Sequence, residues 1–321
     1  MRILITGGLG FIGGRLALHL AEAGHQIILG SRKAISPPAW LPQAEAGKID
    51  WDDDCALEHN CDGVDVVIQA AGMNAQDCAD APVDALAFNG LATARLVAAA
   101  IRAGVKRFIY LSTAHVYASP LIGTITEQTC PKNLHPYATS HLAGEYAVLS
   151  ANERAQIQGI VLRLSNTFGK PIHKDVNCWM LLVNDLCKQA VEKRKLVLQT
   201  SGLQHRDFVS MIDVCRVVEC VAIGQNGSLQ KAIINLGSGV SKSVLAMAQL
   251  IQQRGKQVLG IELELHTSHG ELIERQRKLV YRTDNLFTLG ISFNDSDNIA
   301  EIDSLLCFCY STFNQTHIPT P

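Results

Sequence analysis

The 321-residue sequence lacks basic clusters and Cys-x-x-Cys motifs. Its longest basic run is Lys193-Arg194-Lys195, and 28 Lys and Arg face 30 Asp and Glu, so the charge pattern predicts no nucleic-acid-binding face. Because the ten cysteines form no Cys-x-x-Cys motif, we expect reduced thiols in a cytoplasmic protein, and neither a zinc site nor a disulfide framework. A secreted protein is the alternative that the cysteine count leaves open.

Long apolar runs are also missing. Ile3-Leu4-Ile5 ends at Thr6-Gly7, Arg15 and His19 interrupt the residues that follow, and no later window approaches the ~18 apolar residues of a membrane span. Gly (25) and Pro (10) are too few and too scattered for a disordered or fibrous chain. We therefore expect a soluble protein with no membrane partner.

Short apolar runs alternate with amphipathic stretches of helical length in the first half of the chain. The expected strands are residues 3–6, 26–29, 64–70, 107–112 and 159–164, and the expected helices are residues 12–23, 84–103 and 136–156. Strands that are apolar throughout and separated by helices are typical of a parallel sheet covered on both faces. The predicted fold class is α/β, a doubly wound parallel sheet (Rossmann) over residues 1–169.

The pattern loosens after residue 169. Residues 171–175 indicate a loop, and a helix is expected to follow and to end near residue 193. Residues 241–253 predict another helix, and residues 261–266 a strand. We expect residues 170–321 to form a smaller, mixed substrate-binding domain, some of whose segments pack back on the first.

A glycine-rich turn follows the first expected strand, with the sequence Thr6-Gly7-Gly8-Leu9-Gly10-Phe11-Ile12-Gly13. Glycines let backbone N–H groups approach a pyrophosphate, and the N-terminus of the helix that begins here supplies partial positive charge. The alternative is an ordinary tight strand–helix turn. We interpret the motif as a dinucleotide site, with these expected contacts: Gly7, Gly10, Phe11, Ile12 and Gly13.

The end of the second strand indicates which dinucleotide is preferred. An NAD site usually has an Asp or Glu here for the ribose 2′-hydroxyl, but the sequence reads Gly30-Ser31-Arg32-Lys33. Ser31 and Arg32 could hold a 2′-phosphate, so NADP is favoured over NAD. The alternative is that the basic residues belong to a solvated loop.

Further motifs occur in a fixed order along the chain: Ile49-Asp50-Trp51, Val67-Ile68-Gln69-Ala70-Ala71-Gly72, Asn89-Gly90-x-Ala92-Thr93, Arg163-x-x-Asn166-x-Phe168-Gly169, Arg206-Asp207-Phe208-Val209 and Asn235-Leu236-Gly237-Ser238-Gly239. From residue 1 to about residue 290, the chain resembles extended short-chain dehydrogenases/reductases of the NAD-dependent epimerase/dehydratase family. The resemblance implies further cofactor contacts through Asp50, Trp51, Ala70, Ala71, Gly72 and Asn89.

The same resemblance implies a catalytic set. In the stretch Leu111-Ser112-Thr113-Ala114-His115-Val116-Tyr117 it makes Thr113 the catalytic hydroxyl, for which a turn or capping role is the alternative. Tyr137 is the expected acid/base, but the family's lysine four residues later is His141. We expect His141 to contact the cofactor and to be only partly cationic near its reference pKa of about 6.5. A structural histidine is the alternative.

The substrate implied by the resemblance is a nucleotide-activated sugar. Its expected contacts are His115, Asn166, Arg206 and Arg275, with surface salt bridges as the alternative for each arginine. Dehydratases of the family usually have Asp-Glu after the catalytic Thr, whereas Ala114-His115 stands here. We therefore expect an epimerase or a ketosugar reductase of polysaccharide or deoxysugar biosynthesis, and less so a dehydratase. The alternative is a catalytically weak NAD(P)-binding regulatory protein.

Two further expectations concern metals and assembly. Asp52-Asp53-Asp54 is interpreted as a solvated loop, so no metal site is expected. Family members commonly form homodimers by pairing the helices that correspond to residues 84–103 and 136–156. The resemblance therefore implies a homodimer.

Overall fold

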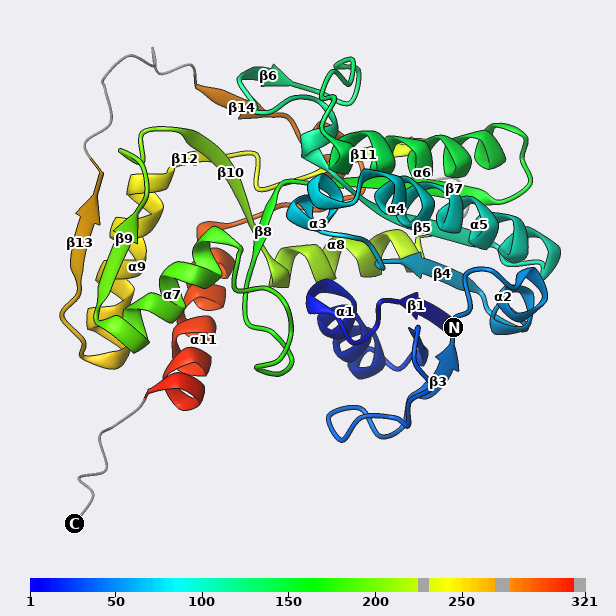
Figure 1. Cartoon of the computed structure of the whole chain (residues 1–321), viewed down its shortest axis with the longest axis horizontal. Helices are drawn as coiled ribbons and strands as arrows, with labels where there is room; N and C mark the ends of the chain where they lie inside the picture. The colour runs from blue at the N-terminus through cyan, green and yellow to red at the C-terminus, as the bar shows by residue number, and fades with distance from the viewer. Residues whose placement is uncertain (225–230, 269–277, 315–321) are drawn as a thin grey trace.

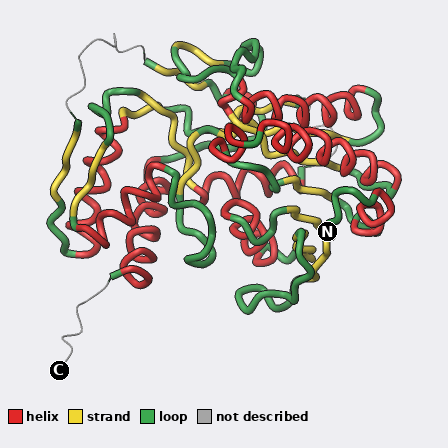
Figure 2. Tube along the Cα trace, in the orientation of Figure 1, coloured by secondary structure: helices red, strands yellow, loops and turns green. Residues whose placement is uncertain are grey.

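A seven-stranded parallel sheet forms the centre of the computed structural model, which describes residues 1–224, 231–268 and 278–314 (Figures 1 and 2). In spatial order the strands are β11 (Ile233–Leu236), β7 (Gln158–Leu164), β5 (Arg107–Thr113), β4 (Val66–Gln69), β1 (Arg2–Thr6), β2 (Gln26–Ser31) and β3 (Glu45–Lys48). Every neighbouring pair is parallel. The predicted doubly wound α/β fold is confirmed.

Helices cover both faces of this sheet (Figure 1). One face packs on α1 (Phe11–Glu22) and α8 (Met211–Ile223), and the other on α2 (Asp54–Asn60), α5 (Thr93–Arg102) and α6 (Pro136–Glu153). Successive residues of a strand point to opposite faces, so Ile3 and Ile5 enter the first core and Leu4 the second. This double burial explains why the strands are apolar throughout.

The expected helix over residues 84–103 is a composite. It consists of α4 (Pro82–Ala85), the π-helical segment η1 (Leu86–Ala92) and α5, and it is preceded by α3 (Ala75–Asp80). By length and composition, Pro82–Arg102 could cross a membrane, but half of its most apolar window is buried inside the protein. Because a methyl group on Gly90 would lie 3.0 Å from Cβ of Ala143, the composite packs closely on α6 like a core helix.

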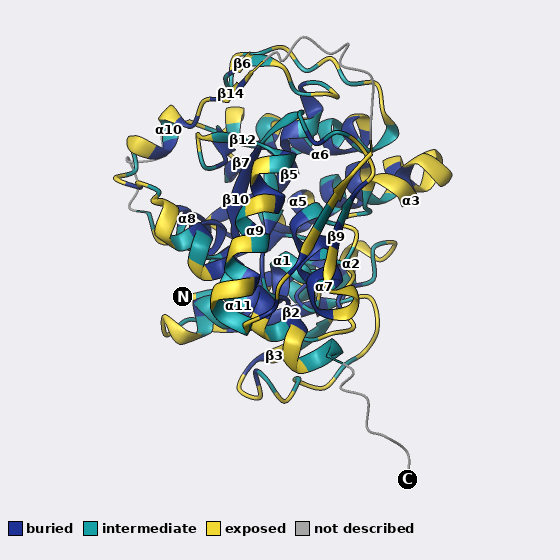
Figure 3. Cartoon of the chain, turned by 90° about the vertical axis from the view of Figure 1, so that its left-hand side faces the viewer, coloured by how far each residue is buried: buried dark blue, intermediate teal, exposed yellow. Residues whose placement is uncertain are grey.

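A second core lies beyond the sheet. It is built by α7 (Leu182–Lys193), α9 (Val244–Leu259) and α11 (Asp295–Phe313). A three-stranded sheet has the order β12 (Ser241–Ser243), β10 (His205–Ser210) and β8 (Asn166–Phe168). Two further strand pairs are β13 (Glu264–Thr267) with β9 (Lys195–Leu198), and β14 (Leu279–Tyr281) with β6 (Gly123–Ile125). The short helices are α10 (Asp284–Phe287) and η2 (Ala114–Val116). In Figure 3 the exposed residues lie on the outer faces of helices such as α3 and α11, whereas β5 and β7 are buried.

Three details differ from the sequence expectations. The helix expected from residue 241 begins at Val244, because residues 241–243 pair with β10 and the Ser243 hydroxyl caps the helix. The strand expected at residues 261–266 spans residues 264–267. Strands β3 and β11 have no counterpart among the expected strands, and β11 extends the large sheet from beyond residue 169. The division at residue 169 into cofactor and substrate regions stays a proposal.

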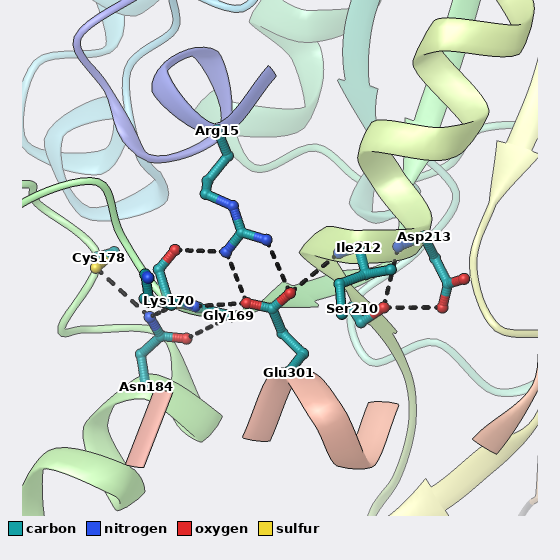
Figure 4. A network of polar contacts seen from close by, with 9 residues as sticks. All are labelled: Arg15, Gly169, Lys170, Cys178, Asn184, Ser210, Ile212, Asp213 and Glu301. Carbon is teal, nitrogen blue, oxygen red and sulfur yellow. Dashed lines mark hydrogen bonds and ion pairs between the residues drawn. The ribbon is translucent and has the colours of Figure 1, made fainter. Parts of the chain in front are cut away.

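A buried carboxylate joins α1 to the second core (Figure 4). Glu301 of α11 is 1% exposed, and the Arg15 guanidinium donates to its two oxygens at 2.7 and 2.9 Å. The backbone N–H groups of Lys170 and Ile212 donate to the same carboxylate at 2.8 and 3.1 Å. Arg15 also donates to the Lys170 carbonyl at 2.7 Å. These bonds attach the segment after β8 and the start of α8 to one carboxylate.

Candidate active site

An open cleft of about 940 Å³ lies at the carboxyl ends of the large sheet's strands and continues between β8 and β10. Sixteen of the residues expected at the site line it: Gly7, Gly10, Phe11, Ile12, Gly13, Ser31, Arg32, Trp51, Ala70, Ala71, Gly72, Thr113, His115, Tyr137, Asn166 and Arg206. Three expected residues do not line it: Asp50, Asn89 and His141. Arg275 lies outside the described residues.

The glycine turn leaves helix α1 open at its N-terminus. Gly7 has a positive φ of 64°, and a methyl group on Gly13 would clash with the Gly7 carbonyl oxygen. No side chain caps α1 at Gly10, and the first turn carries no acidic residue. The first N–H groups of the helix therefore face the cleft without a side-chain partner, where a phosphate anion would be stabilised. These residues fit the pyrophosphate of a dinucleotide.

The outer end of the cleft is aromatic and basic. The Arg32 guanidinium lies 5.7 Å from the centre of the Phe88 ring, and Trp51 contacts Phe88 edge-on at 5.5 Å. Trp51 Nε1 is buried without a hydrogen-bond partner among the described residues. Asp50, by contrast, lies 3.8 Å from the Lys48 ammonium and accepts from the Asp52 N–H at 3.3 Å. The sequence analysis missed Phe88, since an aromatic residue on a helix gives no local sign of facing a cofactor.

Thr113 and Tyr137 both line the cleft and lie next to each other. Thr113 is the last residue of β5, 5% exposed, and its hydroxyl oxygen accepts from the His115 N–H at 3.1 Å. Tyr137 is in the first turn of α6, where Pro136 starts the helix and the His135 ring accepts from the Tyr137 N–H at 3.1 Å. Burial raises the pKa of Tyr137 above 10, and a hydrogen bond with the Thr113 side chain offsets part of the rise.

His141 lies one turn after Tyr137, next to the lining residue Gly72, and does not itself line the cleft. Its ring centre is 4.6 Å from that of Tyr137, edge-on, and its Nδ1 is 2.9 Å from the Tyr110 phenol oxygen. Burial lowers the pKa of His141 to about 4, so the imidazole is neutral near pH 7. The expectation of a partly cationic imidazole is therefore wrong, because the reference pKa applies to a ring in water and this ring is 6% exposed.

Asn89 occupies a buried position between two elements of the site. Its Oδ1 accepts from the Met73 N–H at 2.9 Å, and its Nδ2 donates to the Ser140 hydroxyl at 3.0 Å. The side chain thereby joins the segment after β4 to α6, one residue before His141. Both amide groups thus have partners inside the protein, and the expected cofactor contact of Asn89 stays a prediction.

A buried ion pair that was not among the expected site residues lies under α6. Glu145 follows Tyr137 and His141 at a spacing of four residues, and it is 0% exposed. The Arg163 guanidinium of β7 donates to its carboxylate from Nε at 3.0 Å, and the Ser112 hydroxyl also donates to it, at 2.5 Å. The spacing in α6 was the available signal. These contacts fix the inner face of α6 to the ends of β5 and β7.

The far side of the cleft carries an unneutralised cation. Burial lowers the pKa of Arg206 on β10, and among the described residues no carboxylate pairs with its guanidinium. Burial also lowers the pKa of His115, and the charge of Arg206 lowers it further. Asn166 uses its amide N–H on the Asp207 carbonyl at 2.9 Å. A half-buried cation that pairs with no carboxylate of the described residues favours an anionic ligand at this end.

The order and spacing of these features match one family of proteins. The family model described as "NAD dependent epimerase/dehydratase family" matches residues 3–237. The chain belongs to the NAD-dependent epimerase/dehydratase family. The matched residues include every described residue that lines the cleft. Members of this family are nicotinamide-dependent enzymes.

Individual relatives differ in the reaction that their names give. The chain is 29% identical over 260 residues to dTDP-6-deoxy-L-talose 4-dehydrogenase (NAD(P)(+)) of Kitasatospora kifunensis, covering 78% of each chain. It is 28% identical over 265 residues to dTDP-D-glucose 4,6-dehydratase of Mus musculus, covering 78% of this chain and 72% of that one. The fold is shared with UDP-N-acetylglucosamine 4-epimerase of Methanobrevibacter ruminantium M1, whose structure was solved with UDP-N-acetylmuramic acid. The two structures superpose with a TM-score of 0.80 and 20% sequence identity, covering 97% of this chain and 98% of that one.

Proposed function

We propose that the protein transfers a hydride between a nicotinamide cofactor and a nucleotide-activated sugar, as a ketosugar reductase or an epimerase. The observation that carries the proposal is that Thr113 and Tyr137 line the same cleft as the glycine turn and Arg206. The glycine turn fits a dinucleotide pyrophosphate, and Arg206 fits the diphosphate of a sugar nucleotide. The reacting sugar carbon would then lie beside the two hydroxyls.

The chemistry requires a proton to move at the sugar oxygen. When bound, the nicotinamide ring supplies or accepts a hydride at its C4 position. Tyr137 gives its phenolic proton to the oxygen of a carbonyl being reduced, and takes it back in the reverse direction. Thr113 hydrogen-bonds the same oxygen and orients it. Because burial raises the pKa of Tyr137, the phenol holds its proton near pH 7 and can act as the acid toward a carbonyl oxygen.

The residues after Thr113 bear on the type of reaction. Dehydration needs side chains that remove and add protons on neighbouring sugar carbons. Ala114 is 1% exposed and carries no such group, and the pKa of His115 is lowered by burial. We therefore propose reduction or epimerisation over dehydration, although relatives of both types exist.

NADP is the cofactor that we propose over NAD. No carboxylate lines the cleft at the end of β2, and the residues there are Ser31 and Arg32. The Phe88 ring supports the Arg32 guanidinium at 5.7 Å, which limits its conformations and favours a phosphate contact.

The test separates the proposed reactions. An epimerase should purify with bound NAD, whereas a reductase should oxidise added NADPH when given UDP- or dTDP-linked 4-ketosugars. In either case Tyr137→Phe should lower turnover with little change in cofactor affinity, because only the proton donor is lost.

The neutral His141 in the lysine position favours a second candidate, a catalytically weak regulatory protein. Cofactor binding without turnover on any of these substrates would support that candidate.

We also propose a homodimer. Leu86 and Leu91 of η1 and Tyr146 of α6 are 52%, 55% and 61% exposed, and η1 packs beside α6. Large apolar side chains this exposed on adjacent helices are typical of an interface. Light scattering at micromolar concentration should show a dimer, and Leu91→Glu should convert it to a monomer.

A cytoplasmic location and a role in polysaccharide or deoxysugar synthesis remain proposals that follow from the substrate class.

A further inference from the structure

The two ring nitrogens of His141 face different surroundings. Nδ1 lies 2.9 Å from the phenol oxygen of Tyr110, a residue of β5 that is 1% exposed. On the other side of the ring, a methyl group added to Gly72 would lie 3.7 Å from Cε1 and 3.9 Å from Nε2. Because Gly72 lines the cleft, the Nε2 edge of the ring faces the cleft wall.

The surroundings of Tyr110 make its hydroxyl a donor to His141. Burial raises the pKa of Tyr110 well above 10, so its O–H is retained. The other acceptor within reach of the phenol, the Asn89 carbonyl, is more distant at 3.4 Å.

A neutral imidazole carries one N–H group and one acceptor nitrogen. When Nδ1 accepts a hydrogen bond from Tyr110, the proton of the ring must be on Nε2. We propose that Tyr110 is a positioning residue that fixes neutral His141 as the Nε2–H tautomer, so that an N–H donor faces the nicotinamide ribose of the bound cofactor. The inference rests on the proposed function for the identity of that ligand, whereas the tautomer itself depends only on contacts within the chain.

The arrangement supplies a hydrogen-bond donor where the family has a lysine. A hydroxyl of the ribose is neutral, so it accepts a hydrogen bond from a neutral N–H group without a cation. The other tautomer would turn an acceptor nitrogen toward the cleft and leave two hydrogen-bond donors, Nδ1–H and the Tyr110 O–H, facing each other, unless the phenol turned its proton to the more distant Asn89 carbonyl. The phenol of Tyr110 therefore selects which edge of His141 can donate.

Nitrogen NMR of the histidine rings tests the tautomer directly, in the protein without cofactor. The His141 signals among the eleven histidines are identified by their absence in His141→Gln. Near pH 7 the wild-type ring should show a protonated Nε2 and an unprotonated Nδ1. Tyr110→Phe removes only the hydroxyl, and it should shift the His141 signals toward a mixture of the two tautomers. The matched control is Tyr281→Phe, which removes the buried hydroxyl that donates to the Arg163 carbonyl at 2.7 Å; it should leave the His141 signals unchanged.

Cofactor titration tests where the N–H donor points. Tyr110→Phe should bind NADP⁺ about twofold more weakly, since the donating tautomer is then present in only about half of the molecules. Tyr281→Phe should bind NADP⁺ as the wild type does. A protonated Nδ1 in the wild type, or unchanged His141 signals in Tyr110→Phe, would overturn the assignment of the tautomer. Shifted signals with unchanged NADP⁺ affinity would overturn the contact with the cofactor. If the wild type binds neither NADP⁺ nor NAD⁺ while the tautomer is as expected, the proposed function fails and the tautomer assignment stands.

Discussion

Acidification should destabilise the protein through His141 well before most carboxylates are protonated. In the unfolded chain this imidazole takes up a proton as the pH falls through about 6.5, whereas burial in the native state lowers its pKa to about 4. Between these two pKa values the unfolded state binds one more proton than the native state, so stability falls as the pH falls. At about 1.4 kcal/mol per pKa unit, the full loss is about 3 kcal/mol, and about 1 kcal/mol of it is reached at about pH 5.5.

The assay compares urea unfolding of the wild type with that of His141→Gln, whose side chain does not titrate. Other histidines and carboxylates titrate in both proteins, so they cancel in the difference between the two free energies of unfolding. That difference should move in favour of the variant by about 3 kcal/mol between about pH 7.5 and about pH 4. If the two proteins lose stability in parallel over this range, His141 is protonated in the native state and our reasoning from its burial is refuted.

Three other outcomes follow from the contacts of the site. Glu145→Gln should cost about 3–5 kcal/mol of unfolding free energy, because it leaves the Arg163 guanidinium, 4% exposed, buried without its counter-ion. Asp303→Asn, which breaks a more exposed pair, should cost less than about 1 kcal/mol in the same urea titration, and equal losses would contradict this account. Arg32→Ala should weaken NADP(H) binding by about 1.5–3 kcal/mol and leave NAD(H) nearly unchanged, as measured by calorimetry; equal losses for both cofactors would rule out a phosphate contact. Tyr137→Phe should lower turnover and retain cofactor affinity, and full activity in this variant would exclude the phenol as the proton donor.

Much of the fold follows from local patterns in the sequence. The middle residues of β1, β4 and β5 (3–5, 66–68 and 108–111) are all apolar or aromatic because both faces of these strands are buried, and this pattern is visible without any tertiary information. The glycine turn was equally visible, since a positive φ at Gly7 and the close approach at Gly13 permit few other residues. Strand β3 was not, because Glu45–Lys48 has no apolar alternation and is a strand only through its pairing with β2.

Residue order and local pattern were enough to predict the glycine turn and the strands of the central sheet other than β3 and β11, and the family resemblance pointed to Thr113 and Tyr137. Only the tertiary structure decided the charge of His141 and the partners of its ring. A pKa depends on burial, and the Tyr110 hydroxyl reaches Nδ1 from 31 positions away in the chain. The pairing of Glu145 with Arg163 likewise required α6 to pack on β7 before the two charges could meet. Contacts between elements decide whether a side chain in the lysine position acts as a cation or as a neutral donor, since they fix both its solvation and its tautomer.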